Sequence, residues 1–146
     1  MRKTKKAARK SAGTRAPARP KSVQAMAMPT PAPGITRLPG SGVTRSRVVI
    51  HGGLVYAVAT APEKSDALYD QTRQALAFLN ASLALANTDK TKLLQVTVYI
   101  ADIANKDDMD RAWQEWADPA NAPQRACVGV ALEGQDLVEI VAIAAA

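Results

Sequence analysis

The most informative segment of the sequence spans residues 123–144 and reads PQRACVGVALEGQDLVEIVAIA. Two apolar stretches, residues 125–132 and residues 137–144, flank a polar link that contains Gly134. This pattern predicts two strands joined as a hairpin, because a short turn-rich link favours antiparallel pairing of its neighbours. The second stretch is apolar at both alternating sets of positions, so we expect both faces of the sheet to be covered there.

Two charged residues, Arg125 and Glu139, interrupt these apolar stretches. A buried charge without a partner is strongly unfavourable, and a cross-strand ion pair is one interpretation of the two residues. With a three-residue loop, the hairpin register places Arg125, Cys127 and Glu139 on one face, with Arg125 on the order of 13 Å from Glu139 at about 3.3 Å per residue. At that separation the charges would line a site instead of pairing. A loop one residue longer would move Glu139 to the opposite face.

The residues before this segment predict further strands and two helices. A short extended piece at residues 35–38 precedes a hairpin, in which Gly52-Gly53 separates the β-branched and apolar residues 47–51 and 54–59. Apolar spacings of three, four and seven predict a helix over residues 65–87, and alternation predicts a strand over residues 92–101. A second helix is predicted over residues 105–117, with Asp107, Asp108 and Asp110 in its first turn. The apolar stripes of the helices contain Leu68, Leu76, Leu79, Leu83, Met109, Ala112, Trp113 and Trp116.

The resulting order, ββ(β)αβαββ, predicts an α+β fold. So few helices must lie on one face of the sheet. The other face still needs a cover, because the last strand is apolar on both sides. In a chain this short we expect that cover to be another copy of the chain.

The composition indicates one globular domain preceded by a basic arm. The chain has 146 residues, 47% of them hydrophobic, and a formal net charge of +6. Residues 1–33 hold nine of the 19 basic residues, none of the 13 acidic residues and five of the nine prolines, which predicts a disordered arm. Residues 34–146 hold ten basic and 13 acidic residues. The predicted domain therefore carries a charge of −3, which disfavours a body that grips phosphates.

Three interpretations of the arm stay open. It is a solubilising tail or sequence upstream of a start at Met26 or Met28, a segment that makes weak contact with nucleic acid, or a targeting presequence. The arm lacks the large apolar residues that make a presequence amphipathic, which argues against this third interpretation.

The usual signatures of catalytic centres are missing from the sequence. Cys127 is the only cysteine and His51 the only histidine, so we expect neither an internal disulfide nor a metal site. No glycine-rich loop in the sequence is followed by the helix that a phosphate-binding loop requires. Trp113 and Trp116, at helical spacing, indicate core residues and not a base-stacking platform.

No apolar run reaches the roughly 18 residues that span a bilayer. We therefore expect no membrane contact. The single cysteine fits a reducing compartment, so we expect a cytoplasmic location.

Several motifs together carry a resemblance to a known family: Arg125-Ala126-Cys127-Val128, Val138-Glu139-Ile140, Ala142-Ile143-Ala144, Thr97-Val98-Tyr99-Ile100-Ala101-Asp102 and the helix from Met109 to Trp116. They resemble the reactive-intermediate deaminase family, the Rid or YjgF-like proteins, over about residues 35–146. The paired tryptophans and Val48-Val49-Ile50-His51 are most similar to its YoaB-like branch. The basic arm lies outside the resemblance.

The resemblance implies a fold like that of Bacillus-type chorismate mutase, assembled as a homotrimer with sites between the subunits. It implies a hydrolase similar to 2-iminobutanoate/2-iminopropanoate deaminase, which converts small enamino or imino acids such as 2-aminoacrylate to 2-keto acids and ammonia without a metal or cofactor. In that scheme Arg125 holds the substrate carboxylate and Glu139 orients or deprotonates the attacking water. Cys127, Val58 and Ala59 line the pocket.

Three positions depart from the better-known deaminase branch. Arg45 stands where that branch has a tyrosine, Val58 where it has a serine, and Ala104 where it has an asparagine. These changes remove polar contacts and leave activity on the smallest imino acids open, while Val58 would admit a bulkier side chain. Two other functions remain as alternatives: a non-catalytic regulatory trimer that binds small carboxylates, and a ribonuclease or translation inhibitor. The acidic body and the lack of a usable histidine argue against RNA cleavage.

Overall fold

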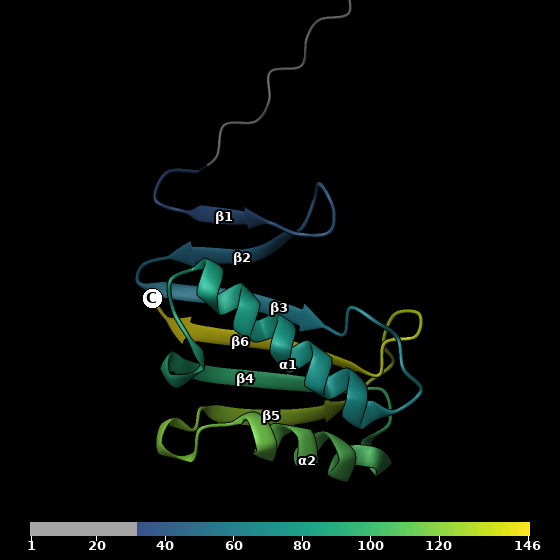
Figure 1. The fold of residues 1–146 in the computed structure, drawn as a ribbon. Helices are drawn as coiled ribbons and strands as arrows, with labels where there is room; N and C mark the ends of the chain where they lie inside the picture. Colours follow the sequence, from purple (N-terminus) through teal and green to yellow (C-terminus); the bar gives the residue numbers. More distant parts are fainter. Residues whose placement is uncertain (1–31) are drawn as a thin grey trace, which may run out of the picture. The chain divides into compact units, whose positions relative to one another are not determined.

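The computed structural model of the protein describes residues 32–146, and this part of the chain begins with three antiparallel strands (Figure 1). They are β1 (Thr36–Pro39), β2 (Ser46–His51) and β3 (Leu54–Thr60). Gly52 and Gly53 turn the chain between β2 and β3 with φ angles of +58° and +76°, which glycine adopts without strain. The predicted first hairpin is confirmed.

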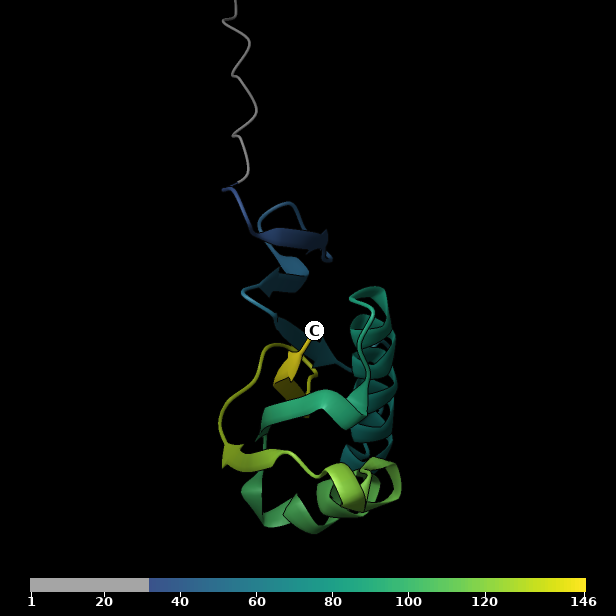
Figure 2. The same cartoon turned by 90° about the vertical axis from the view of Figure 1, so that its left-hand side faces the viewer.

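The remaining elements follow the predicted order. They are α1 (Leu68–Leu85), β4 (Leu93–Ile100), α2 (Lys106–Trp116), β5 (Gln124–Gly129) and β6 (Val138–Ala145), with 3-10 turns η1 (Lys90–Lys92), η2 (Ile103–Asn105) and η3 (Pro119–Asn121). Figure 2 shows both helices on the same side of the sheet, so the predicted α+β layering is confirmed. None of the helices within residues 32–146 is long and apolar enough to cross a membrane.

The six strands lie in the order β1-β2-β3-β6-β4-β5, which contradicts the predicted terminal hairpin. Strand β4 lies between β5 and β6, pairing parallel with β5 and antiparallel with β6. The reason is the helix between β4 and β5: a strand, a crossover helix and a second strand favour parallel neighbours. Residues 130–137 are therefore a loop that passes the end of β4, and not a hairpin turn.

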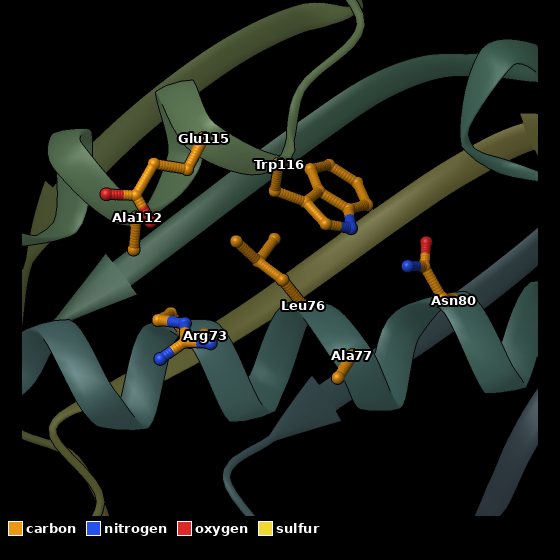
Figure 3. Close-up of a pocket in the computed structure, with 7 residues that line it drawn as sticks. All are labelled: Arg73, Leu76, Ala77, Asn80, Ala112, Glu115 and Trp116. Carbon is orange, nitrogen blue, oxygen red and sulfur yellow. The ribbon is translucent and has the colours of Figure 1, made fainter.

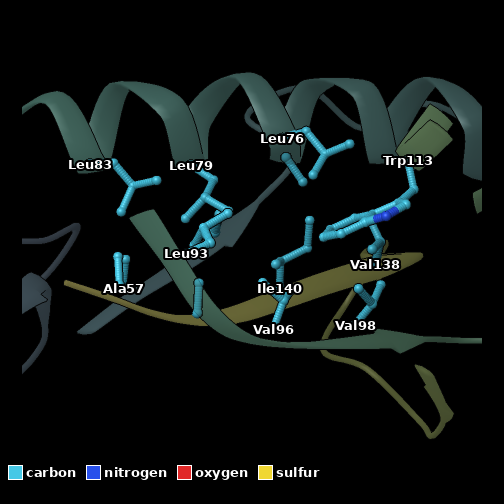
Figure 4. Close-up of a cluster of buried hydrophobic side chains, with 14 of the residues drawn as sticks. Ala57, Leu76, Leu79, Leu83, Leu93, Val96, Val98, Trp113, Val138 and Ile140 are labelled. Atoms are coloured by element: carbon cyan, nitrogen blue, oxygen red, sulfur yellow. The ribbon is translucent and has the colours of Figure 1, made fainter. Parts of the chain in front are cut away.

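The hydrophobic core lies between the sheet and the helices. Leu76, Leu79 and Leu83 of α1 point on to the sheet above Val96 and Ile140, as Figure 4 shows. All five side chains are at most 1% exposed. Burying a leucine of this kind stabilises a fold by about 1.5–3 kcal/mol, so this layer fixes where each strand sits.

The opposite face of the sheet is uncovered within the chain. Its central row pairs Val58 of β3 with Val141 of β6, Thr97 of β4 and Ala126 of β5. Val58 keeps 44% of its surface exposed, against 1% for its neighbour Ala59 on the helix side. We call the side of the strands that faces away from α1 and α2 the open face.

A buried amide ties two loops to α1. The side chain of Gln71 is fully buried, and its Nε2 donates to the carbonyls of Ser65 at 2.7 Å and Gln135 at 2.9 Å. Its Oε1 accepts from the backbone N–H of Leu137 at 2.9 Å. Gln71 thus anchors the segment before α1 and the segment that leads into β6.

The predicted arm, residues 1–33, lies outside the described residues except for its last two. The structure therefore leaves the three interpretations of the arm as predictions.

Candidate functional site on the open face and at the β5 edge

Glu139 of β6 projects from the open face, in a row of residues that runs across the sheet. Thr60 of β3 and Tyr99 of β4 are its neighbours on either side, and Val128 of β5 lies beyond Tyr99. Glu139 is half-buried, and among residues 32–146 no side chain or backbone group pairs with its carboxylate. It is also the only acidic residue at the open-face positions of the described strands. A carboxylate so placed is available to a water molecule or to a ligand.

Arg125 of β5 lies on the other side of the sheet, facing α2. Its Nη2 donates to Asp110 Oδ1 at 2.7 Å, and its Nη1 lies 3.8 Å from Met109 Sδ. The guanidinium also stands over the ring of Trp113, with 5.1 Å between Cζ and the ring centroid. The Arg125 side chain is 22% exposed. Because a guanidinium has five N–H donors, the bond to Asp110 leaves donors for a second acceptor.

The Asp110 carboxylate accepts hydrogen bonds from two cations, Arg125 and Lys106. Partial burial pushes the pKa of the Asp110 carboxyl upward, but the hydrogen bonds and charges of Lys106 and Arg125 outweigh it, and the pKa lies below its ordinary value. The sequence pattern had placed Asp110 in the first turn of the helix. Since α2 begins at Lys106, only Asp107 and Asp108 occupy that turn, and Asp110 pairs with β5 instead.

The structure does not bring Arg125 and Glu139 together within one chain, so the predicted common face is wrong. Arg125 pairs with Val96 of β4 and Glu139 pairs with Tyr99. The two positions are thus three residues apart along the strands and two strands apart across them, on the order of 14 Å between Cα atoms at about 3.3 Å per residue and 4.8 Å per strand. Their side chains leave opposite faces, because Val96 and Tyr99 have opposite orientations.

The other predicted site residues are divided between the same two places. Cys127 lies beside Arg125 on the helix side, and burial raises the pKa of its thiol, with Asp110 adding to the increase and Lys106 and Arg125 opposing it. Val58 lies on the open face, one row from Glu139, whereas Ala59 is buried in the core. The predicted roles of these residues remain predictions.

His51 occupies the exposed end of β2, as predicted for a surface residue. Its Nδ1 lies 2.9 Å from the carbonyl oxygen of Gly34. Three strands, β3, β6 and β4, lie between β2 and β5, so His51 and Cys127 are far apart. Sequence reasoning missed Thr60 and Tyr99 as neighbours of Glu139, and only the strand order could have revealed them.

Comparison with known proteins identifies the family. The family model described as Endoribonuclease L-PSP matches residues 39–146. A RutC family protein of Haemophilus ducreyi is 42% identical over 102 residues, which cover 68% of this chain and 87% of the relative. The RutC family protein YoaB of Escherichia coli is 34% identical over 88 residues, covering 60% of this chain and 76% of YoaB.

Solved structures agree with this match. NMB1025 of Neisseria meningitidis, described as a member of the YjgF protein family, superposes with a TM-score of 0.72 at 26% identity, covering 76% of this chain and 93% of that one. A protein of the conserved Rid family from Yersinia pestis gives a TM-score of 0.70 at 27% identity, covering 75% of this chain and 94% of that one. The fold is the chorismate-mutase-like fold expected from the resemblance. The chain therefore belongs to the Endoribonuclease L-PSP family, the Rid or YjgF-like proteins, and has YoaB-like relatives.

Proposed function

We propose that the protein is a homotrimeric hydrolase that converts small 2-imino acids, and the enamines in equilibrium with them, to 2-keto acids and ammonia. The observation that carries the proposal is the half-buried carboxylate of Glu139, which has no partner among residues 32–146 and projects from a sheet face that the chain itself leaves uncovered. Membership of the Rid family supports this chemistry for that carboxylate.

The reaction needs few groups. Glu139 takes a proton from water as the water oxygen bonds to the imine carbon and the C=N π electrons pass to nitrogen. That proton then goes to the nitrogen, which gives an amino alcohol. As the C–N bond breaks, the hydroxyl proton passes through Glu139 to the departing nitrogen, so that ammonia and the keto acid are formed. An enamine enters this sequence after protonation of its β carbon. Because an imine carbon is already electrophilic, a fixed substrate and a positioned base are sufficient.

The 14 Å separation on opposite faces means that one substrate cannot touch both Arg125 and Glu139 of a single chain. In the proposed trimer the open faces of three copies pack together, and the β5 edge of one copy approaches the open face of the next. Arg125 of one subunit then binds the substrate carboxylate with the donors left free by Asp110, while the partner supplies the carboxylate base.

The direct test follows ammonia release. The full chain is added to an amino-acid oxidase that generates 2-imino acids from a panel of amino acids, and the rate of ammonia formation is compared with that of the oxidase alone. We expect acceleration, and a loss of roughly a hundredfold or more of that acceleration in Glu139→Gln and Arg125→Ala. Arg111→Ala is the matched control, since Arg111 is an exposed arginine of α2 that pairs with Asp108. No acceleration with any amino acid would contradict the proposal.

A second test asks whether the two residues come from different subunits. Arg125→Ala and Glu139→Gln chains are co-expressed so that they mix at random within trimers. If each site takes one residue from each of two subunits, about a quarter of the sites regain both, and about a quarter of the wild-type rate returns. No recovery in the mixed trimers would show that one subunit supplies both residues, and would overturn the shared site.

The alternative functions give different results. A regulatory trimer would bind pyruvate or a similar carboxylate in an Arg125-dependent way without accelerating ammonia release. A ribonuclease would cleave RNA in the absence of the oxidase, and any RNA binding through the arm would disappear on deletion of residues 1–33.

A further inference from the structure

A groove between α1 and α2 lies apart from the open face and takes no part in the proposed reaction. It has a volume of about 280 Å³. Helix α1 contributes Arg73, Leu76 and Asn80 to its walls, and α2 contributes Ala112, Glu115 and Trp116 (Figure 3). The groove thus combines an apolar floor with polar groups at both ends.

The indole N–H of Trp116 is the unusual group in this groove. Its Nε1 is buried and has no hydrogen-bond acceptor among residues 32–146. Figure 3 shows this nitrogen turned toward the side of the groove that holds Asn80. An indole N–H can only donate, and a buried donor without an acceptor is unfavourable. An oxygen atom supplied by a ligand would satisfy it after a small movement of the side chains that cover the nitrogen.

The other polar groups of the groove also have unused donors. Arg73 makes neither an ion pair nor a hydrogen bond with a described residue, and the same holds for the Asn80 side chain. The one acid, Glu115, is already engaged, because its Oε2 accepts from the Tyr69 hydroxyl at 2.7 Å. The Tyr69 ring lies against Arg111, with 4.1 Å to the ring centroid, which adds a second positive charge near Glu115. Arg73, Asn80 and Trp116 therefore offer free donors along the groove.

We propose that this groove binds a small organic acid with two oxygen-bearing ends and an apolar carbon chain between them. One carboxylate binds the Arg73 guanidinium, and an oxygen at the far end accepts from the Trp116 indole. Arg73 and Asn80 are seven residues apart on α1, which is about 10 Å along a helix at 1.5 Å per residue. The carbon chain lies over Leu76 and beside the Trp116 ring. This site is independent of Glu139, Arg125 and the proposed function.

The test uses adipate, a six-carbon dicarboxylate, as the probe on the full chain. The protein is labelled with ¹⁵N, and its two indole N–H signals are assigned with Trp116→Phe and followed during titration. We expect the Trp116 signal to move downfield and saturate, while the Trp113 signal moves much less. 1,6-Diaminohexane has the same carbon chain with the opposite charge and should leave both signals in place.

Two arginine variants identify the carboxylate partner. Arg73→Gln should weaken adipate binding by about tenfold, the usual loss on removal of a charged hydrogen-bond donor. Arg111→Gln, on the same side of the helix pair but outside the groove wall, should bind within about twofold of the wild type. Both side chains are exposed, so neither variant is expected to affect folding. An unmoved Trp116 signal, equal binding by Arg73→Gln, or a shift that diamine reproduces would each overturn the site.

Discussion

The two faces of the sheet are built from similar residues but differ in what covers them. On β6, Val138, Ile140 and Ala142 face the helices and are at most 1% exposed. Val141 and Ile143 alternate with them along the same strand, yet they remain only half-buried on the open face. Helices α1 and α2 cover one face, whereas no segment within residues 32–146 covers the other.

This difference separates two roles that one strand can serve. The covered face fixes the fold, because its side chains are packed on all sides. The open face exposes Tyr56 and Val58 by 40% and 44%, and Glu139 is the one acidic residue that the strands within residues 32–146 place on it. A monomeric protein rarely leaves such a surface in water, so we expect assembly and chemistry to depend on this face and stability to depend on the other.

Disrupting the open face should have the largest effect. Val58→Asp places a charge at the centre of that face, and burying it against another copy would be strongly unfavourable. We expect light scattering to give a trimer of the 15.5 kDa chain for the wild type and a monomer for the variant. Val43→Asp is the control, because Val43 is fully exposed in the loop between β1 and β2. A Val58→Asp protein that keeps the wild-type mass would contradict a role for the open face in assembly.

Neighbouring residues of β6 should separate the two faces in unfolding experiments. Ile140→Ala removes a fully buried side chain of the covered face, and we expect the free energy of unfolding in urea to fall by about 2–5 kcal/mol. Val141→Ala on the open face should have a smaller effect that changes with protein concentration, because in the proposed trimer this side chain contacts another copy. Equal, concentration-independent losses in both variants would show that the two faces do not differ in this way.

The Asp110–Arg125 pair should make a modest, pH-dependent contribution on the covered side. The folded pKa of Asp110 lies below its ordinary value of 3.8, so the pair stabilises the fold above that pH and loses this effect as the pH falls through the folded pKa. We expect Asp110→Asn to lower the free energy of unfolding by on the order of 1 kcal/mol at pH 7 and by much less near pH 2. Asp107→Asn, at an exposed position of the same helix, is the control and should lower the free energy of unfolding at pH 7 by less than Asp110→Asn does.

The reactivity of Cys127 should give the smallest difference. Burial raises the pKa of this thiol, so little thiolate is present at neutral pH. We expect iodoacetamide to modify it several-fold more slowly than it modifies N-acetylcysteine at pH 7.5, and at a similar rate after unfolding in urea. A native rate that exceeds the model thiol would show that Arg125 and Lys106 dominate its surroundings instead.

Local patterns in the sequence were sufficient for the elements but not for the order of the strands. The leucines of α1 and the alternation of β4 identify their elements, because burial on one face leaves a period in the sequence. The pairing of β5 with β4 leaves no such local trace. A short link before β6 suggested a hairpin, although the helix between β4 and β5 favoured parallel pairing.

The same error placed Glu139 and Arg125 on one face. Both residues were recognised as charges in apolar strands, and the family resemblance gave them roles. Their faces depend on register, and a change of one residue in a strand reverses every side chain. The partner of Arg125 was equally hidden, because Asp110 is far from β5 in sequence and was explained by the helix dipole.

The single amide of Gln71 has a consequence for how the molecule moves. Its hydrogen bonds go to Ser65, after the strand end that carries Thr60, and to Gln135 and Leu137, before the strand that carries Glu139. Either loop can therefore open only by losing a hydrogen bond to the side chain that also holds the other loop. The two loops should therefore exchange their amide protons as one cooperative unit, and any opening that admits or releases a ligand near Glu139 would involve both.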